Sequence, residues 1–234
     1  MELPFFYLAD IPPNANELVL PEETSKHIIS VLRMQESDEL QLTNGQGKMV
    51  RASILKAHKK SCTLKTIEVL QSVDSRKPVT LAISLLKNPS RFEWMLEKVT
   101  EIGLGAVIPL ISHRTERQHF RADRMKNIMV SAMLQSQQSW LPEMMEPVSY
   151  LEVLKMGDFE KKYIAHCLPE ERSTLREEAV KNTSSIILIG PEGDFSPTEI
   201  STAIEQGYKP VTLGDTRLRT ETAGVVAATL LSIR

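Results

Sequence analysis

From residue 79 onward the chain alternates between short apolar runs and stretches of helical periodicity, and this alternation restricts the fold more than any other feature of the sequence. Residues 79–86 form a nearly continuous apolar run, which is typical of a parallel strand buried on both faces. Apolar residues then repeat at helical spacing over 92–102, and a second apolar run follows at 106–110. This order predicts two parallel strands joined by a helix.

The same alternation continues towards the C-terminus. The apolar pattern predicts helices at 121–138 and 173–181 and strands at 163–165, 185–189 and 211–213. Strands that alternate with helices favour a parallel sheet covered by those helices. We therefore expect residues 79–234 to form an α/β domain with a mostly parallel sheet.

The N-terminal part follows a different pattern, in which polar and apolar residues alternate and turns are frequent. Alternating segments on both sides of the turn at 43–47 predict a hairpin, and a further strand is expected at 61–70. One helix is expected between Pro21 and Arg33. These elements predict a small β-rich domain.

A change of composition marks the boundary between the two parts. Residues 73–78 are polar and charged and end in proline, which is typical of a linker. The sequence therefore predicts two domains, at 1–72 and 79–234, joined by a linker at 73–78.

The composition limits the class of protein. The chain is 41% apolar and 25% charged, as folded globular proteins are, and no apolar run approaches the roughly 20 residues of a membrane span. The N-terminus lacks the features of a signal peptide. Cys62 and Cys167 lie far apart, which excludes a disulfide framework and a zinc site built from cysteines. We expect a soluble cytoplasmic protein without a metal ion.

Charge supports nucleic-acid binding only locally, because the formal net charge is −2. Residues 51–77 hold seven Lys or Arg against two acidic residues, and residues 113–126 hold five against two. An ordinary solvated surface has the same composition and stays an alternative. The candidate RNA contacts are Lys59, Lys60, Arg114, Arg117 and Arg121.

The strand at 185–189 runs directly into a glycine-containing loop at 190–195. Ligands of open α/β sheets bind beyond the carboxyl ends of the strands, where this loop is expected to lie. Ser196 as N-cap and Glu199 three residues later predict a capping box that starts the next helix. The sequence therefore predicts a ligand loop held at a helix terminus, with an ordinary tight turn as the alternative.

The chemistry of the loop at 190–195 favours a cationic ligand. The sequence contains neither the phosphate-binding GxxxxGK[ST] motif nor GxGxxG, and Glu192 places a carboxylate where a polyphosphate would be repelled. S-adenosylmethionine has a positively charged sulfonium, an ammonium group and ribose hydroxyls that can donate to a carboxylate. It suits this loop better than a nucleotide phosphate.

A second strand-end loop lies at 213–219. The strand before it ends at Gly214, and Thr220 is expected to cap a helix whose first turn holds Glu221. Small residues on that helix permit close approach of the backbone, although a plain core helix explains them equally well. The histidines lack metal-ligand spacing and a nucleophile partner, so we expect them to be structural or surface residues.

Two motifs carry a resemblance to a known family. IGPEGDFSPTEI at 189–200 and LGDTRLRTETAGVVAA at 213–228 resemble the SPOUT class of knotted methyltransferases, and specifically the RsmE family of ribosomal-RNA uridine N3-methyltransferases. The stretches at 85–110 and 112–117 extend the resemblance upstream. SKHIISVLRM at 25–34 is similar to the N-terminal PUA-like barrel of that family, so the resemblance covers nearly the whole chain.

The chain departs from the family pattern at three places. Asp194 stands where GPEGG has its last glycine, Arg217-Leu218-Arg219 replaces ILR, and Gln138 replaces the usual arginine after Gln-Ser. The first two departures are compatible with the same backbone geometry. The replacement by Gln138 puts a phosphate or substrate contact at that position in doubt.

The resemblance implies an α/β C-terminal SPOUT domain with a trefoil knot and a small N-terminal PUA-like β-barrel that helps to hold RNA. It implies a homodimer that uses S-adenosylmethionine to methylate N3 of a uridine in 16S ribosomal RNA, either as free RNA or in the assembled small subunit. A SPOUT methyltransferase with a different RNA target and a non-catalytic RNA-binding assembly factor are the alternatives.

Site residues follow from the two loops. Arg219 is the candidate for stabilising negative charge on the reacting base or for holding a phosphate, because a guanidinium group offers a planar set of donors. Glu221 either orders the site or complements the helix dipole. The expected cofactor contacts are Leu188, Ile189, Gly190, Pro191, Glu192, Gly193, Leu213, Gly214, Leu218 and Thr222.

Overall fold

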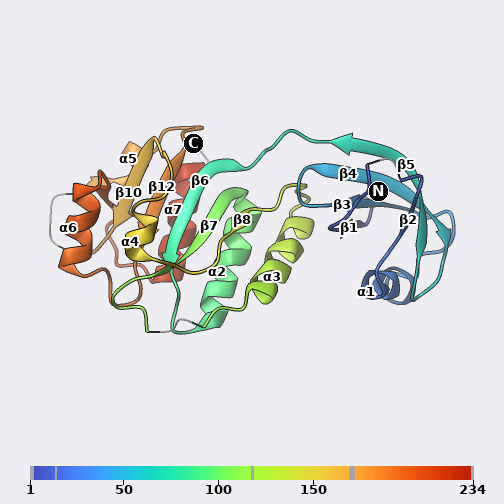
Figure 1. Ribbon diagram of the computed structural model, residues 1–234, viewed down its shortest axis with the longest axis horizontal. Helices are drawn as coiled ribbons and strands as arrows, with labels where there is room; N and C mark the ends of the chain where they lie inside the picture. The colour runs from blue at the N-terminus through green and yellow to red at the C-terminus, as the bar shows by residue number, and fades with distance from the viewer. Residues whose placement is uncertain (1–2, 14, 117–118, 169–171, 233–234) are drawn as a thin grey trace. The chain divides into compact units, whose positions relative to one another are not determined.

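The computed structural model describes residues 3–13, 15–116, 119–168 and 172–232 (Figure 1). The chain forms two compact units. The N-terminal unit consists of residues 1–75 and 133–141, and the C-terminal unit consists of residues 76–132 and 142–234. The helix α3 (Ala122–Gln135) begins in the C-terminal unit and ends in the N-terminal unit.

The N-terminal unit is built on a five-stranded sheet with the strand order β1-β3-β4-β5-β2. The bounds are β1 (Phe5–Tyr7), β2 (Glu17–Val19), β3 (Glu39–Thr43), β4 (Lys48–Lys56) and β5 (Thr63–Gln71). β3 and β4 form the predicted antiparallel hairpin, in which Leu40 faces Ala52 and Leu42 faces Val50. The order runs from β1 to β2 without a closing pair among the described strands, so the expected PUA-like β domain has the form of a half-barrel.

The predicted helix of this unit consists of two parts, α1 (Glu22–Lys26) and a π-helical turn, η1 (His27–Val31). Ile28 on this turn is fully buried among apolar side chains of the sheet. The buried Ser25 hydroxyl donates to the Leu20 carbonyl at 3.1 Å and accepts from the Cys62 backbone amide at 2.9 Å. The hydroxyl therefore joins the helix to the residues that precede β5.

Residues 133–141 belong to the N-terminal unit, which the sequence pattern did not predict. The Thr43 hydroxyl donates to the Ser139 carbonyl at 3.2 Å, and the Trp140 indole donates to the Ser72 hydroxyl at 2.9 Å. Gly47 has φ +79, and a Cβ atom there would lie 2.4 Å from the Trp140 ring. A glycine is therefore required for the close approach of Trp140 to the hairpin turn.

The expected linker at 73–78 is only partly outside regular structure. Residues 73–75 are exposed and lie outside regular structure, whereas Lys77 and Pro78 already belong to β6 (Lys77–Ser84). Limited proteolysis is expected to cut first at 73–76. Because residues 133–141 pack into the N-terminal unit, the fragments should then co-elute in gel filtration under native conditions. First cuts within 40–57 or 90–110 would contradict the two-domain division.

The C-terminal unit is built on a parallel sheet with the order β11-β13-β10-β12-β6-β7-β8, and β9 also pairs with β7. Every pairing between these strands is parallel, as the alternation of strands and helices predicted. The other strands are β7 (Leu104–Ile111), β8 (Glu143–Met144), β9 (Val148–Ser149), β10 (Lys161–Ala165), β11 (Ser173–Thr174), β12 (Ser185–Ile189) and β13 (Lys209–Thr212).

The helices of this unit are, besides α3, α2 (Pro89–Ile102), α4 (Tyr150–Val153), α5 (Leu175–Glu178), α6 (Pro197–Glu205) and α7 (Thr220–Ser232). The predicted helix at 173–181 is wrong in extent, because Ser173 and Thr174 pair with β13 and the backbone becomes extended again at Ala179. On α7, a Cβ atom at Gly224 would lie 2.7 Å from the Ile83 side chain. Gly224 therefore permits α7 to pack closely on β6, beside α2.

The trefoil knot that the resemblance implies stays a prediction. In the part of the chain that the structure describes, the helices are too short or too polar to cross a membrane.

Candidate functional site

A cavity of about 630 Å³ lies at the carboxyl ends of three neighbouring strands, β13, β10 and β12. Parallel strands end at the same edge of a sheet, so the residues that follow these strands meet there. Most of the lining comes from the last residues of these strands and the loops that follow them, namely 165–167 at β10, 189–192 with Asp194 at β12, and 211–220 at β13. A cavity of this size is within the range of small-molecule sites, about 300–1,000 Å³.

The loop at 190–195 is fastened to three other segments of the C-terminal unit. Glu192 Oε1 accepts from the Lys87 backbone amide at 3.1 Å. The Gly193 carbonyl accepts from Arg114 Nη1 at 2.6 Å. The side chain of Asp194 accepts from the Cys167 backbone amide at 2.7 Å. These hydrogen bonds tie the loop to the segments that follow β6, β7 and β10.

The helix after this loop begins as predicted. The Ser196 hydroxyl accepts from the Glu199 backbone amide, and the Glu199 carboxylate accepts from the Ser196 backbone amide at 2.8 Å. Phe195 is buried, with its ring centroid 5.4 Å from that of Tyr150. The capping box and this buried ring fix the end of the loop.

The glycines of the two loops differ in the space around them. Gly214 has φ +147, and a Cβ atom there would meet no protein atom within 4 Å. Because Gly214 lines the cavity, a side chain at this position enters space available to a ligand. At Gly190, by contrast, a Cβ atom would lie 3.1 Å from the Phe195 backbone nitrogen. A side chain at Gly190, which also lines the cavity, would therefore crowd the loop itself.

The structure brings most of the expected cofactor contacts to one cavity, which is lined by Ile189, Gly190, Pro191, Glu192, Leu213, Gly214 and Leu218. Arg219 lines it as well. Leu188 lies in the hydrophobic core, Gly193 lies beside the Arg114 side chain, and Thr222 is on α7 outside the lining. The roles of all these residues stay predictions.

Sequence reasoning missed several residues of the lining. His166 and Cys167 follow β10, and the strand-end rule that identified the other two loops could have identified them. Arg172 also lines the cavity, and its guanidinium donates to the His166 carbonyl. Arg91 reaches the cavity from α2, and no local pattern in the sequence indicates this.

The lining combines charges of both signs. The carboxylates suit a ligand with a cationic centre, and the guanidinium groups suit an anionic substrate or a developing negative charge. The basic members are Arg91, Arg172, Arg217 and Arg219, and the acidic members are Glu192, Asp194 and Asp215. No cluster of three or more His, Cys, Asp or Glu that could hold a metal ion occurs within the described ranges.

The pKa of the Cys167 thiol depends on this electrostatic environment. Partial burial raises its pKa above the usual range, and the nearby Asp194 carboxylate raises it further. Arg217 and Arg172 act in the opposite direction. The thiol is therefore protonated at neutral pH and is a weak nucleophile.

Glu221 is buried, and it lies beside one of the cavity arginines. Its Oε1 atom is 3.6 Å from Arg91 Nε, and the side chains of Glu221 and Arg91 are 9% and 40% exposed. Its Oε2 atom is buried without a hydrogen-bond partner among the described residues. Glu221 does not line the cavity itself, whereas its ion-pair partner Arg91 does.

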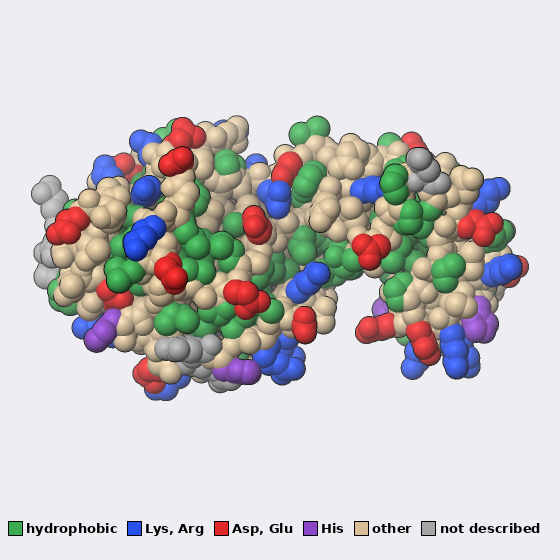
Figure 2. Space-filling model, in the orientation of Figure 1, with side chains coloured by type: hydrophobic (Ala, Val, Ile, Leu, Met, Phe, Trp, Pro, Cys, Tyr) green, Lys and Arg blue, Asp and Glu red, His purple; other side chains and the backbone are tan. Residues whose placement is uncertain are grey.

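The candidate RNA contacts lie in both units. Lys59 and Lys60 are exposed in the loop between β4 and β5, and Arg121 is exposed directly before α3. Arg114 is exposed and holds the Gly193 carbonyl, and Arg117 lies outside the described residues. Basic and acidic side chains intermingle on the face of each unit that Figure 2 shows. RNA binding by these residues stays a prediction.

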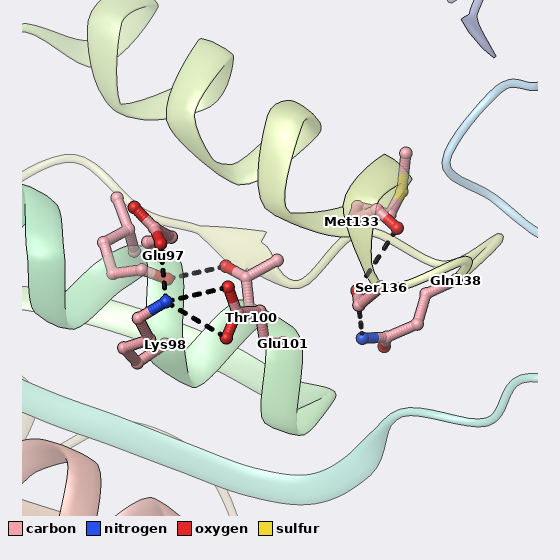
Figure 3. A network of polar contacts seen from close by, with 8 residues as sticks. Glu97, Lys98, Thr100, Glu101, Met133, Ser136 and Gln138 are labelled. Atoms are coloured by element: carbon pink, nitrogen blue, oxygen red, sulfur yellow. Dashed lines mark hydrogen bonds and ion pairs between the residues drawn. The ribbon is translucent and has the colours of Figure 1, made fainter. Parts of the chain in front are cut away.

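Gln138, which replaces the arginine usual in the family, bonds within its own segment (Figure 3). Its Nε2 atom donates to the Ser136 hydroxyl at 2.8 Å, and that hydroxyl donates to the Met133 carbonyl at 3.3 Å. These bonds stabilise the turn that follows α3 and precedes Trp140.

Comparison with protein-family models gives two matches. The model described as an RNA methyltransferase domain matches residues 73–232, and the model described as an RNA methyltransferase PUA domain matches residues 20–67. The first match contains all three strand ends that form the cavity.

Individual relatives agree with these matches. "Ribosomal RNA small subunit methyltransferase E" of Synechocystis is 31% identical over 84% of this chain, which spans 66% of that protein's length. The solved structure of a "probable rRNA-methyltransferase" from Porphyromonas gingivalis is 37% identical, with 99% of both chains covered and a TM-score of 0.91. The Neisseria gonorrhoeae "Ribosomal RNA small subunit methyltransferase E", solved bound to S-adenosyl methionine, is 28% identical over 99% of this chain and 98% of its own, with a TM-score of 0.83.

Proposed function

Because this chain belongs to the RNA methyltransferase family, we propose that it transfers a methyl group from S-adenosylmethionine to N3 of a uridine in 16S ribosomal RNA of the small subunit. The observation that carries the proposal is the cavity at the ends of β10, β12 and β13, within the part of the chain that matches the methyltransferase model. A relative that aligns with nearly the whole chain is named as a small-subunit rRNA methyltransferase and was solved bound to this cofactor.

The residues around the cavity fit the cofactor. The space beside Gly214 is open, and the Glu192 and Asp215 carboxylates offer acceptors to ammonium and hydroxyl groups. Backbone of the loops at 190–194 and 213–218 would hold the nucleoside part. When bound, S-adenosylmethionine supplies an electrophilic methyl group on a positively charged sulfur.

The arginines of the cavity suit the negative charge that develops on the substrate. Uridine N3 carries an imide proton, and its loss leaves negative charge that spreads to the two neighbouring carbonyl oxygens. Arg219 stabilises this charge or holds an adjacent phosphate. Arg91 is a second cation at the cavity, and the buried Glu221 carboxylate restricts its position.

The N-terminal unit helps to hold ribosomal RNA, and the match to an RNA methyltransferase PUA domain supports this role. The family resemblance supports a homodimer that acts in the cytoplasm, on free RNA or on the assembled small subunit.

Isothermal titration with S-adenosylmethionine tests whether the chain is an enzyme or an assembly factor. Saturable binding at one site per chain supports the enzyme. A folded protein that does not bind the cofactor favours the non-catalytic alternative. A methyltransferase with a different RNA target would bind the cofactor but methylate another RNA.

The second prediction is that RNA binding depends on local basic residues and weakens with salt. Neutralising Lys59, Lys60 and Arg121 to Gln is expected to flatten the slope of log affinity against log salt by about 2 to 3 units, because each phosphate contact contributes roughly 0.7 to 0.9. Filter binding of a 16S ribosomal RNA fragment across a salt series measures the slope.

A matched triple variant provides the control for this experiment. Lys155, Arg176 and Lys181 are exposed basic residues outside the two predicted RNA-binding segments. Their neutralisation changes the net charge equally and should leave the slope almost unchanged. Equal slopes for both triple variants would place the RNA elsewhere on the protein.

A further inference from the structure

Asp194 has a backbone conformation that side chains other than glycine rarely adopt. Its φ is +64, in the left-handed region. A glycine would adopt this conformation without steric cost. An aspartate here must therefore be compensated by interactions that a glycine lacks.

The Asp194 carboxylate makes two short hydrogen bonds to backbone amides. Oδ1 accepts from the Phe195 amide at 2.7 Å, within the loop at 190–195. Oδ2 accepts from the Cys167 amide, also at 2.7 Å, and Cys167 follows β10. Hydrogen bonds to an ionised carboxylate are about twice as strong as those between neutral groups.

The bond to Cys167 joins two parts of the cavity wall. β10 and β12 are adjacent parallel strands, with Ala165 paired with Ile189. Cys167 and Asp194 lie beyond the carboxyl ends of these strands, and both line the cavity. The Asp194 carboxylate thus bridges the segments that continue the two strands.

We propose that Asp194 is a positioning residue that fixes the loop at 190–195 against the end of β10, and that cofactor affinity depends on this bridge. The inference rests on the proposed function, because it takes the cofactor to be S-adenosylmethionine. The loop's other ties, through Glu192 and Gly193, reach residues before α2 and after β7. The Asp194 bridge ties the loop to the segment that follows β10.

A residue that only tolerates the turn would give different results from a residue that forms the bridge. Gly adopts the left-handed conformation readily, and Asn adopts it as well as Asp does. Gly loses both acceptors, and Asn keeps a single oxygen and brings an amide donor towards a backbone N–H group. The bridge therefore predicts that Asp194→Asn and Asp194→Gly both lose affinity, whereas a mere turn residue predicts that both retain it.

The test measures S-adenosylmethionine affinity by isothermal titration for wild type and both variants. We expect about tenfold weaker binding for each, the scale of a lost charge-assisted hydrogen bond. The matched control is Asn182→Gly, because Asn182 is exposed with φ +56 and lies outside the cavity lining. This control should bind like wild type. Wild-type affinity in Asp194→Gly and Asp194→Asn would overturn the proposal.

Alkylation of Cys167 by iodoacetamide tests the bridge without any cofactor. The Asp194 carboxylate raises the pKa of this exposed thiol, and Arg172 and Arg217 lower it. Removal of this carboxylate in Asp194→Asn should therefore shift the pH profile of alkylation to lower pH, as followed by mass spectrometry. The profile of Asn182→Gly should match that of wild type. An unshifted profile contradicts the bridge. Failure of wild type to bind S-adenosylmethionine contradicts the proposed function instead, and the shift in the profile is still expected.

Discussion

Arg219→Ala is expected to keep its affinity for S-adenosylmethionine and to lose turnover by about a hundredfold or more. Arg219 lines the cavity directly before α7, where its guanidinium can face the reacting base. Loss of the uridine imide proton creates charge that a fixed cation stabilises in the transition state more than in the ground state. The change should therefore appear in kcat rather than in cofactor binding.

Single-turnover methylation of 16S ribosomal RNA, with cofactor affinity measured in parallel, separates these two effects. Arg219→Lys should recover little activity, because an ammonium group lacks the planar donor pair. Arg176→Ala removes an exposed arginine outside the cavity and should behave like wild type. Near-normal turnover of Arg219→Ala would assign charge stabilisation to another residue, and Arg91 is then the first to test.

Gly214→Val is expected to abolish cofactor binding. The valine side chain would project into the open space beside the loop at 213–219, and the φ of +147 at Gly214 is poorly suited to a β-branched residue. The variant therefore combines backbone strain with loss of ligand volume. Isothermal titration of the folded variant with S-adenosylmethionine measures the effect.

Gly207→Val separates strain from loss of volume. Gly207 has φ +83, a Cβ atom there would also meet nothing within 4 Å, and the residue does not line the cavity. This variant should lose thermal stability but keep cofactor affinity. Wild-type affinity in a folded Gly214→Val protein would remove Gly214 from the binding site.

Much of the fold could be predicted because its determinants are local. The hairpin of β3 and β4 follows from alternation around a turn, and β12 was predicted with the bounds that the structure has. The capping box of Ser196 and Glu199 depends on two residues three positions apart. The placement of residues 133–141 depends instead on bonds from Ser139 and Trp140 to residues far away in the sequence, which periodicity does not reveal.

The site could be predicted in part for the same reason. Gly190 directly follows β12 and Gly214 lies two residues after the end of β13, so the strand-end rule applies to each loop alone. That β10 lies between these two strands follows from the strand order of the sheet, which the sequence does not specify locally. The pairing of Glu221 with Arg91 likewise joins two helices, α7 and α2, that are distant in the chain.

Comparison of 16S ribosomal RNA from strains with and without this gene tests the central claim most directly. Digestion to nucleosides and mass spectrometry should detect N3-methyluridine in the RNA of the parent strain, its loss in the deletion strain, and its return with the wild-type gene but not with the Arg219→Ala gene. An unchanged content of N3-methyluridine in 16S ribosomal RNA after deletion of the gene would contradict the claim.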